Sequence, residues 1–352
     1  MSTSTVTERQ PRKPGWGSSF TTNMVSMTWT RGSGWSLPEV VPYAPMIIDP
    51  AMVGLHYGQV VFEGLKAYRQ ESGHIAVFRP NDHGRRFARS AERLAMPALP
   101  VALFTEAVEA YVRANQDEVP HARDQSLYLR PIMFASEANL ALKPADEYRF
   151  LIMGFAAETF FDPNLPAVSV WASQRYVRAV RGGTGEAKCA GNYAAAMPAQ
   201  LEAAHNRCQQ VLWLDALERR WIEEMGGMNV FFVYGRGADS VLITPPLTGS
   251  LLPGLTRDSL LTLAAEEGLT VAERPVSIGD LRWDCQQGAV SEGFACGTAA
   301  VVTPIGEIKW HNQTWQVGDG GAGPVALWLK QRLLDIQYGR ESDDHGWLHS
   351  VV

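Results

Sequence analysis

The chain has 352 residues, of which 46% are hydrophobic and 19% charged, and its formal net charge is −6. This composition provides ample apolar side chains for a folded core and excludes disorder, collagen and coiled coil as descriptions of the whole chain. The acidic balance disfavours a nucleic-acid-binding protein, which usually carries a basic excess. At roughly 100–200 residues per domain, we expect two domains.

The first half of the chain is predicted to be rich in strands. Strands are expected over 60–69, interrupted at Gly64, and over 74–79, joined as a hairpin about Gly73. Helices are expected over 81–95 and 104–115, followed by buried strands over 126–134 and 148–157. The turn-rich stretch 158–166 indicates a domain boundary. We therefore place a disordered tail at 1–18, a small α/β domain at 19–161, a linker at 162–175 and a larger domain at 176–352.

The second half has a mixed α/β pattern. It predicts a helix over 190–206, in which Pro198 should cause a kink, and strands over 210–214 and 228–234. Two more helices are expected over 254–267 and 325–338. The polar first 18 residues lack the apolar core of a secretory signal, and the apolar run 150–157 is too short to span a membrane.

Cysteine and histidine usage gives no sign of a metal site. The four cysteines include no CxxC pair, and the eight histidines show no HExxH spacing. Sparse cysteines disfavour a disulfide scaffold and fit a reducing compartment. We expect a cytoplasmic protein that binds no metal, no nucleic acid and no membrane.

The segment GGTGEAKCAGNY, residues 182–193, places a lysine between a glycine-rich loop and a helix. A phosphate-binding P-loop needs glycine directly before the lysine and serine or threonine after it, but the neighbours here are Ala187 and Cys189. Lys188 is flanked by small and apolar residues, and a buried lysine becomes a nucleophile toward carbonyl carbon. The residues alone leave open whether Lys188 is a solvated loop lysine or forms a Schiff base.

Two adjacent carboxylates end an apolar strand in IEEMGGMNVFF, residues 222–232. Glu223 and Glu224 either face water at the strand end, or one of them points inward at a cationic nitrogen. A carboxylate opposite a pyridine nitrogen keeps that nitrogen protonated, as pyridoxal chemistry requires.

Three segments are candidates for binding an anion. Leu255 and Thr256 open a helix, where backbone N–H groups and the helix dipole attract negative charge. Thr298 lies in a second small turn, and Arg86 lies in an arginine-rich helix. Two of them have an ordinary alternative: Thr256 as a helix cap and Arg86 as part of a solvated arginine stripe.

Taken in order, these segments resemble the branched-chain amino acid aminotransferases, which are pyridoxal phosphate enzymes of fold type IV. The similarity covers nearly the whole chain from about residue 20. It rests on the motifs HYGQVVFEGLKAYR (56–69), FRPNDHGRRFARSAERL (78–94), SLYLRP (126–131), GGTGEAKCAGNYAAAM (182–197), QVLWLDA (210–216), EMGGMNVFFV (224–233) and LTGSLLPGLTR (247–257). The resemblance implies a two-domain, mixed α/β fold of the D-amino acid aminotransferase type.

The resemblance also implies roles toward pyridoxal 5′-phosphate. Lys188 would form the Schiff base and carry the proton between substrate and cofactor. Glu224, rather than Glu223, would pair with the pyridine nitrogen, and Tyr193 would bind the phenolic oxygen. The phosphate would be held by Arg86, Leu255, Thr256 and Thr298.

A second group of residues would bind the substrate. Tyr57, Tyr128 and Arg130 would organise the α-carboxylate site. The backbone N–H groups of Thr298 and Ala299 would bind that carboxylate. The apolar pocket would be formed by Phe20 and Phe62, and Leu142 would reach the pocket of a partner subunit, which implies a homodimer.

The implied reaction is reversible amino transfer between L-leucine, L-isoleucine or L-valine and 2-oxoglutarate. An aromatic pocket gains roughly 0.8 kcal/mol per buried methylene, which favours branched apolar side chains. The alternatives within the fold are a D-amino acid aminotransferase and an aminodeoxychorismate lyase, which the triplet Tyr128-Leu129-Arg130 disfavours. A nucleotide-binding protein and a non-catalytic relative are alternatives of other classes.

The chain departs from the pattern of many relatives at two places near the site. Gly227 stands where they have a threonine, so a hydroxyl contact is expected to be lost. Positions 300 and 303 hold alanine and threonine where some relatives carry a CxxC pair, so thiol redox control by that pair is expected to be absent.

Overall fold

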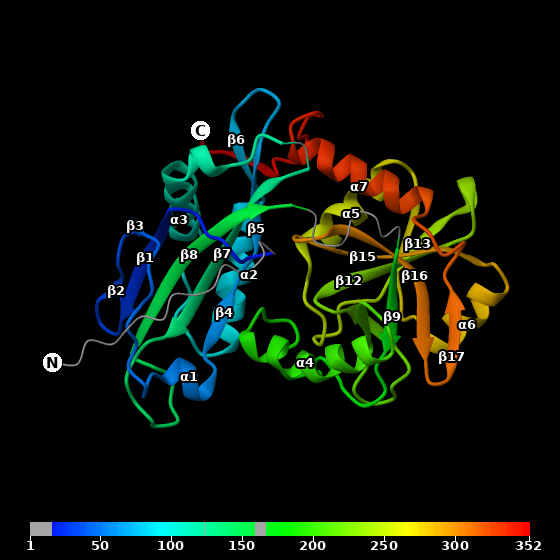
Figure 1. The fold of residues 1–352 in the computed structure, drawn as a ribbon, viewed down its shortest axis with the longest axis horizontal. Helices are drawn as coiled ribbons and strands as arrows, with labels where there is room; N and C mark the ends of the chain where they lie inside the picture. The colour runs from blue at the N-terminus through cyan, green and yellow to red at the C-terminus, as the bar shows by residue number, and fades with distance from the viewer. Residues whose placement is uncertain (1–15, 123, 159–166) are drawn as a thin grey trace.

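The computed structural model describes residues 16–122, 124–158 and 167–352, and its strands form two sheets of nine strands each (Figure 1). Most strand pairs in both sheets are antiparallel, and helices pack against them. The expected mixed α/β class is therefore observed. Within the described residues, no helix has the length and apolar character needed to cross a membrane.

The first sheet has the strand order β18-β6-β5-β7-β8-β1-β2, with β3 paired to β1 and β4 to β7. Its strands are β1 (Asn23–Thr30), β2 (Gly34–Trp35), β3 (Glu39–Pro42), β4 (Val60–Phe62), β5 (Leu65–Arg69), β6 (Ile75–Phe78), β7 (Ser126–Ala135), β8 (Glu147–Ala157) and β18 (Leu348–Ser350). Its helices are α1 (Val53–Tyr57), α2 (Pro80–Arg93), α3 (Val101–Ala114) and a 3-10 turn at Gln116–Glu118.

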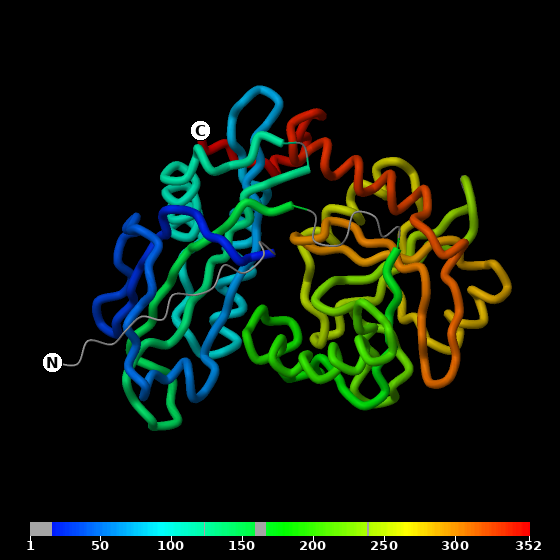
Figure 2. Tube along the Cα trace, in the orientation of Figure 1, coloured from blue at the N-terminus to red at the C-terminus, as the bar shows by residue number. Residues whose placement is uncertain are grey.

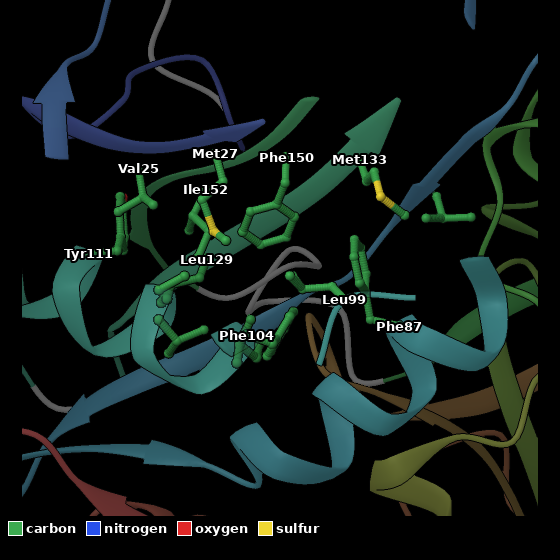
Figure 3. Packing of buried hydrophobic residues seen from close by; sticks show 14 of the residues in the cluster. Val25, Met27, Phe87, Leu99, Phe104, Tyr111, Leu129, Met133, Phe150 and Ile152 are labelled. Carbon is green, nitrogen blue, oxygen red and sulfur yellow. The ribbon is translucent and has the colours of Figure 1, made fainter. Parts of the chain in front are cut away.

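Helices α2 and α3 cover one face of this sheet and close its core (Figure 3). Phe87 of α2 and Phe104 of α3 bring their rings to 5.4 and 6.1 Å from the ring of Phe150 on β8. All three rings are fully buried. This packing fixes α2 on the sheet and so fixes the arginines that α2 carries.

The second sheet has the order β11-β10-β9-β16-β15-β12-β13-β14, with β17 on β16, and β11 also pairs with β12. That last pairing closes the strands from β11 to β12 into a barrel. The strands are β9 (Val168–Ala172), β10 (Gln210–Leu214), β11 (Ile222–Met225), β12 (Met228–Tyr234), β13 (Val241–Thr244), β14 (Thr270–Glu273), β15 (Val290–Gly297), β16 (Val301–Trp310) and β17 (Gln313–Gln316). The helices are α4 (Ala190–His205), α5 (Leu255–Glu266), α6 (Ile278–Gln286), α7 (Pro324–Gln337) and a 3-10 turn at Gly237–Asp239.

The structure differs from the predicted domain boundaries at both ends of the second domain. Within the predicted linker 162–175, residues 168–172 form β9, because its buried side chains at Val168, Val170 and Ala172 face the barrel core. Residues 162–166 lie outside the described residues, as do residues 1–15 of the predicted tail. At the other end, the chain returns to the first domain, where β18 pairs with β6 (Figure 2).

Helix α4 runs through Pro198 as one helix, so the proline does not interrupt it. The predicted break at Gly64 is observed, since it separates β4 from β5. A Cβ atom at Gly64 would lie 2.1 Å from the hydroxyl oxygen of Tyr128 on β7. The glycine therefore lets the tyrosine ring lie against the chain at this point.

Candidate active site

A cavity of about 430 Å³ lies where side chains of the two domains meet. Both domains contribute to its wall, and the residues predicted to bind cofactor or substrate are prominent there. Those that line it are Phe62, Arg86, Tyr128, Arg130, Lys188, Tyr193, Leu255, Thr256, Thr298 and Ala299.

Lys188 is held just before α4 by contacts to the first domain. Its backbone N–H donates to Ser90 Oγ at 2.9 Å, and its carbonyl accepts the N–H of Phe62 at 3.0 Å. Its Nζ donates to the hydroxyl of Tyr193 at 2.8 Å and lies 5.0 Å from the centre of the Phe62 ring. Lys188 therefore lines the cavity with an oriented amine, and a solvated loop lysine is the wrong interpretation.

Glu224 is a buried carboxylate that is bound to Arg178 and Leu252, two residues that line the cavity. Its Oε2 lies 2.8 Å from Nε of Arg178, and its Oε1 accepts the N–H of Leu252 at 2.7 Å. Burial raises the pKa of Glu224, and the Arg178 guanidinium opposes that rise. Glu223 is also buried and accepts the hydroxyl of Ser250, so neither carboxylate faces water.

Arg178 also ties the glycine-rich loop to the barrel. Its Nη2 donates to the carbonyls of Gly185 and Ser250, each at 2.8 Å. Nothing in the local sequence indicates this role, because arginines also stand at positions 175 and 181 and their pattern does not distinguish the buried one.

Arg86 belongs to a buried charge cluster that includes two residues missed from the sequence. Its Nε and Nη2 donate to the two oxygens of Glu63 at 2.7 and 2.8 Å, and His83 Nδ1 lies 2.8 Å from the same carboxylate. Arg86 and His83 hold the pKa of Glu63 well below its usual range, despite full burial of the carboxylate. Arg85 instead pairs with Asp82 and is exposed. The solvated-stripe interpretation of Arg86 is thus wrong.

Glu63 could have been identified from the apolar residues that surround it in the sequence. A carboxylate set in the apolar sequence VVFEGL needs a cation if the strand is buried.

The start of α5 offers backbone N–H groups to the cavity. Gly254 precedes the helix and provides no side-chain cap. A Cβ atom at Gly254 would lie 2.0 Å from Oδ1 of Asn229, so the backbone approaches this wall too closely for a side chain. With Thr256, Thr298 and Arg86 on the same cavity, the donors suit a phosphate group. Together with Lys188 and Glu224, they fit a phosphorylated pyridine aldehyde.

Aromatic rings also line the cavity. Arg130 donates to the Tyr128 hydroxyl at 3.0 Å and its guanidinium lies 4.8 Å from the centre of the Phe62 ring. Trp16, which falls in the predicted tail, lines the cavity and packs edge-on against Tyr128 and Phe155 at 5.7 and 5.2 Å. The prediction of a disordered tail over 1–18 therefore missed Trp16 as a residue that lines the site.

Three predicted substrate residues lie away from this cavity within one chain. Phe20 stacks on Tyr43 at 4.8 Å between ring centres and does not line this cavity, so its place in the substrate pocket stays a prediction. The hydroxyl of Tyr57 donates to the carbonyl of Leu140 at 2.6 Å, and Leu142 is 85% exposed.

The sequence matches the family described as Amino-transferase class IV over residues 60–308. The chain belongs to this family. It is 49% identical over 340 residues to a probable branched-chain-amino-acid aminotransferase of Streptomyces coelicolor, covering 96% of this chain and 93% of that one. It is 48% identical over 342 residues to the branched-chain-amino-acid aminotransferase of Mycobacterium tuberculosis, covering 97% and 93%.

Solved structures of branched-chain aminotransferases have the same fold. The enzyme of Escherichia coli matches with a TM-score of 0.75 at 29% identity, over 93% of this chain and 100% of that one. A second enzyme, from T.th. and complexed with N-(5′-phosphopyridoxyl)-L-glutamate, has the same TM-score and identity, over 93% and 99%. The predicted fold type and the predicted membership among branched-chain aminotransferases are confirmed, and the chain is an enzyme that transfers amino groups.

Proposed function

We propose that this aminotransferase binds pyridoxal 5′-phosphate and transfers amino groups reversibly between L-leucine, L-isoleucine or L-valine and 2-oxoglutarate. The observation that carries the proposal is that one cavity is lined by the Lys188 amine and the anion site at Arg86 and α5, with the buried Glu224 bound to Arg178, which also lines it. Solved relatives hold pyridoxamine 5′-phosphate or a phosphopyridoxyl-glutamate adduct. Glutamate in that adduct supports 2-oxoglutarate as the second substrate.

The bound cofactor would supply an electron sink for the pair of electrons left when the substrate Cα–H bond ionises. Lys188 Nζ would bind the cofactor and, once released, would take the proton from the substrate Cα and deliver it to the cofactor carbon C4′. Tyr193 keeps Nζ oriented through the 2.8 Å hydrogen bond. Glu224 would hold a proton on the pyridine nitrogen, and Arg178 fixes its position.

The lining of the cavity supports a preference for branched apolar substrates. Phe62, Tyr128 and Trp16 present ring surface on which each buried methylene gains roughly 0.8 kcal/mol. One methylene distinguishes substrates by only about 1–3 kcal/mol, so the three branched amino acids should all react. Arg130 and the Tyr128 hydroxyl offer donors to a carboxylate of the substrate.

Steady-state assays with 2-oxoglutarate test this substrate assignment. We expect L-leucine, L-isoleucine and L-valine to yield L-glutamate with kcat/KM values within about 200-fold of one another. D-leucine and D-alanine should give none. Faster turnover of a D-amino acid would instead identify a D-amino acid aminotransferase, and release of pyruvate from aminodeoxychorismate would identify the lyase.

We also propose that two copies associate through the face around α1. Several large apolar side chains there are strongly exposed, which is uncommon on a monomer. They are Ile47, Leu55, Leu140 and Leu142, at 100%, 58%, 58% and 85% exposure. Sedimentation should give twice the 38.7 kDa chain mass, and Leu142→Asp should shift it toward the monomer. A monomeric wild-type enzyme contradicts this arrangement.

A cytoplasmic location is part of the same proposal. It is supported by the four free cysteines, three of which are buried.

A further inference from the structure

Lys66 reaches from the first domain to the second beside the active site. It lies on β5 directly opposite Tyr128 of β7, and only 6% of it is exposed. Its Nζ donates to the carbonyl oxygen of Ala299 at 3.1 Å. Among the residues that the structure describes, no carboxylate forms an ion pair with it.

The turn that Lys66 contacts has an unfavourable backbone. Residues 298–300 join β15 to β16, and Val301, which closes the turn opposite Gly297, has a φ of 60°. A β-branched residue rarely adopts this left-handed conformation, and such strain persists only where surrounding contacts enforce it. The hydrogen bond from Lys66 is one such contact, and it comes from the other domain.

Lys66 also stands directly behind the anion site. A cavity of about 10 Å³ is shared by Lys66, His83, Thr256 and Thr298. The charge of Arg86 is already balanced by Glu63, and burial lowers the pKa of His83, which favours its neutral form.

Burial of the Lys66 ammonium removes it from water, which disfavours its charged form. Burial, with the charge of Lys330, lowers the pKa of Lys66 to about 8. An anion bound at the neighbouring turn would stabilise this ammonium.

We infer that Lys66 is a positioning residue for the substrate carboxylate: it holds the Thr298–Ala299 turn in place and contributes an uncompensated positive charge beside it. The inference rests on the proposed function and on the role that the family resemblance implies for this turn, whose backbone N–H groups would bind the α-carboxylate. Lys66 does not touch the substrate in this arrangement. It acts through the turn.

The test compares a carboxylate ligand with its neutral analogue on the cofactor-loaded enzyme. In Lys66→Met we expect the Kd of 4-methylpentanoate and the KM of L-leucine to rise about tenfold, with kcat within about threefold of wild type. The Kd of 4-methylpentanamide should change little, whereas simple distortion of the pocket would weaken acid and amide alike. Lys66→Gln, which keeps a donor but no charge, should give a smaller loss of acid binding.

Lys309→Met is the matched control, because Lys309 Nζ also donates to a backbone carbonyl at 3.1 Å, that of Asn206, and does not line the cavity. It should bind both ligands like wild type. Unchanged acid binding in both Lys66 variants, or equal losses for acid and amide, would overturn the inference. A wild-type enzyme that fails to turn over L-leucine would instead contradict the proposed function.

Discussion

Replacing Lys188 with alanine is expected to lower kcat for amino transfer from L-leucine by at least about 10³-fold, because the variant loses the amine that binds the cofactor and moves the proton. The fold should survive, since Lys188 is tied to Ser90 and Phe62 through its backbone, and its side chain adds one hydrogen bond, to Tyr193, and contacts with the Phe62 and Tyr193 rings. Steady-state rates and thermal unfolding of the purified variant measure both effects.

Lys143→Ala is a suitable control for this experiment. Lys143 pairs with surface carboxylates Glu137 and Asp146, and its side chain is 38% exposed. It should retain wild-type turnover. A Lys188→Ala enzyme that works within about tenfold of wild type would show that the amine is not the reacting group.

Replacing Glu63 with glutamine is expected to give the largest loss of stability. The substitution removes the carboxylate that Arg86 and His83 share in a fully buried cluster, and breaking a buried ion pair typically costs about 3–5 kcal/mol. Affinity for pyridoxal 5′-phosphate should also fall, because Arg86 loses the partner that orients it. Urea unfolding and cofactor titration measure the two effects, with the exposed Glu71→Gln as the matched control.

The same carboxylate predicts a pH dependence with a definite sign. Its folded-state pKa is depressed, so its stabilising contribution is present above the unfolded-state pKa of about 4.3 and is lost as pH falls further toward the folded value. The difference in unfolding free energy between wild type and Glu63→Gln should therefore be constant near neutral pH and shrink below about pH 4. If Glu63→Gln lowered the free energy of unfolding at neutral pH by no more than Glu71→Gln does, this would contradict the role of the cluster.

Local sequence patterns predicted the helices and strands in which apolar residues recur at a regular spacing. They also predicted the site residues that stand in distinctive motifs. The break at Gly64 and the helix beginning at Leu255 follow from glycine placement, and Lys188 and Tyr193 lie close together in the chain at the start of α4. These features depend on neighbours in the chain, so the residues alone indicate them.

Features that depend on distant neighbours were not predictable in the same way. Glu63 and Arg86 are 23 positions apart, and Arg178 and Glu224 are 46 apart, so only the fold brings each pair together. The part that Trp16 plays in the cavity wall was not predictable for the same reason, because it lies in an irregular segment and only tertiary packing brings it against Tyr128. Strand β9 was not predicted, because its five residues are too few to show a clear hydrophobic period and they follow directly on a turn-rich stretch.

The most direct measurement of the central claim is an absorbance spectrum of the cofactor-loaded enzyme before and after L-leucine is added without any oxo acid. The visible band should give way to the near-ultraviolet band of pyridoxamine 5′-phosphate, and 2-oxoglutarate should restore it. A protein that stays colourless after incubation with pyridoxal 5′-phosphate would contradict the assigned roles of Lys188, Glu224 and Arg86 together. A coloured protein whose spectrum L-leucine leaves unchanged would contradict the substrate assignment.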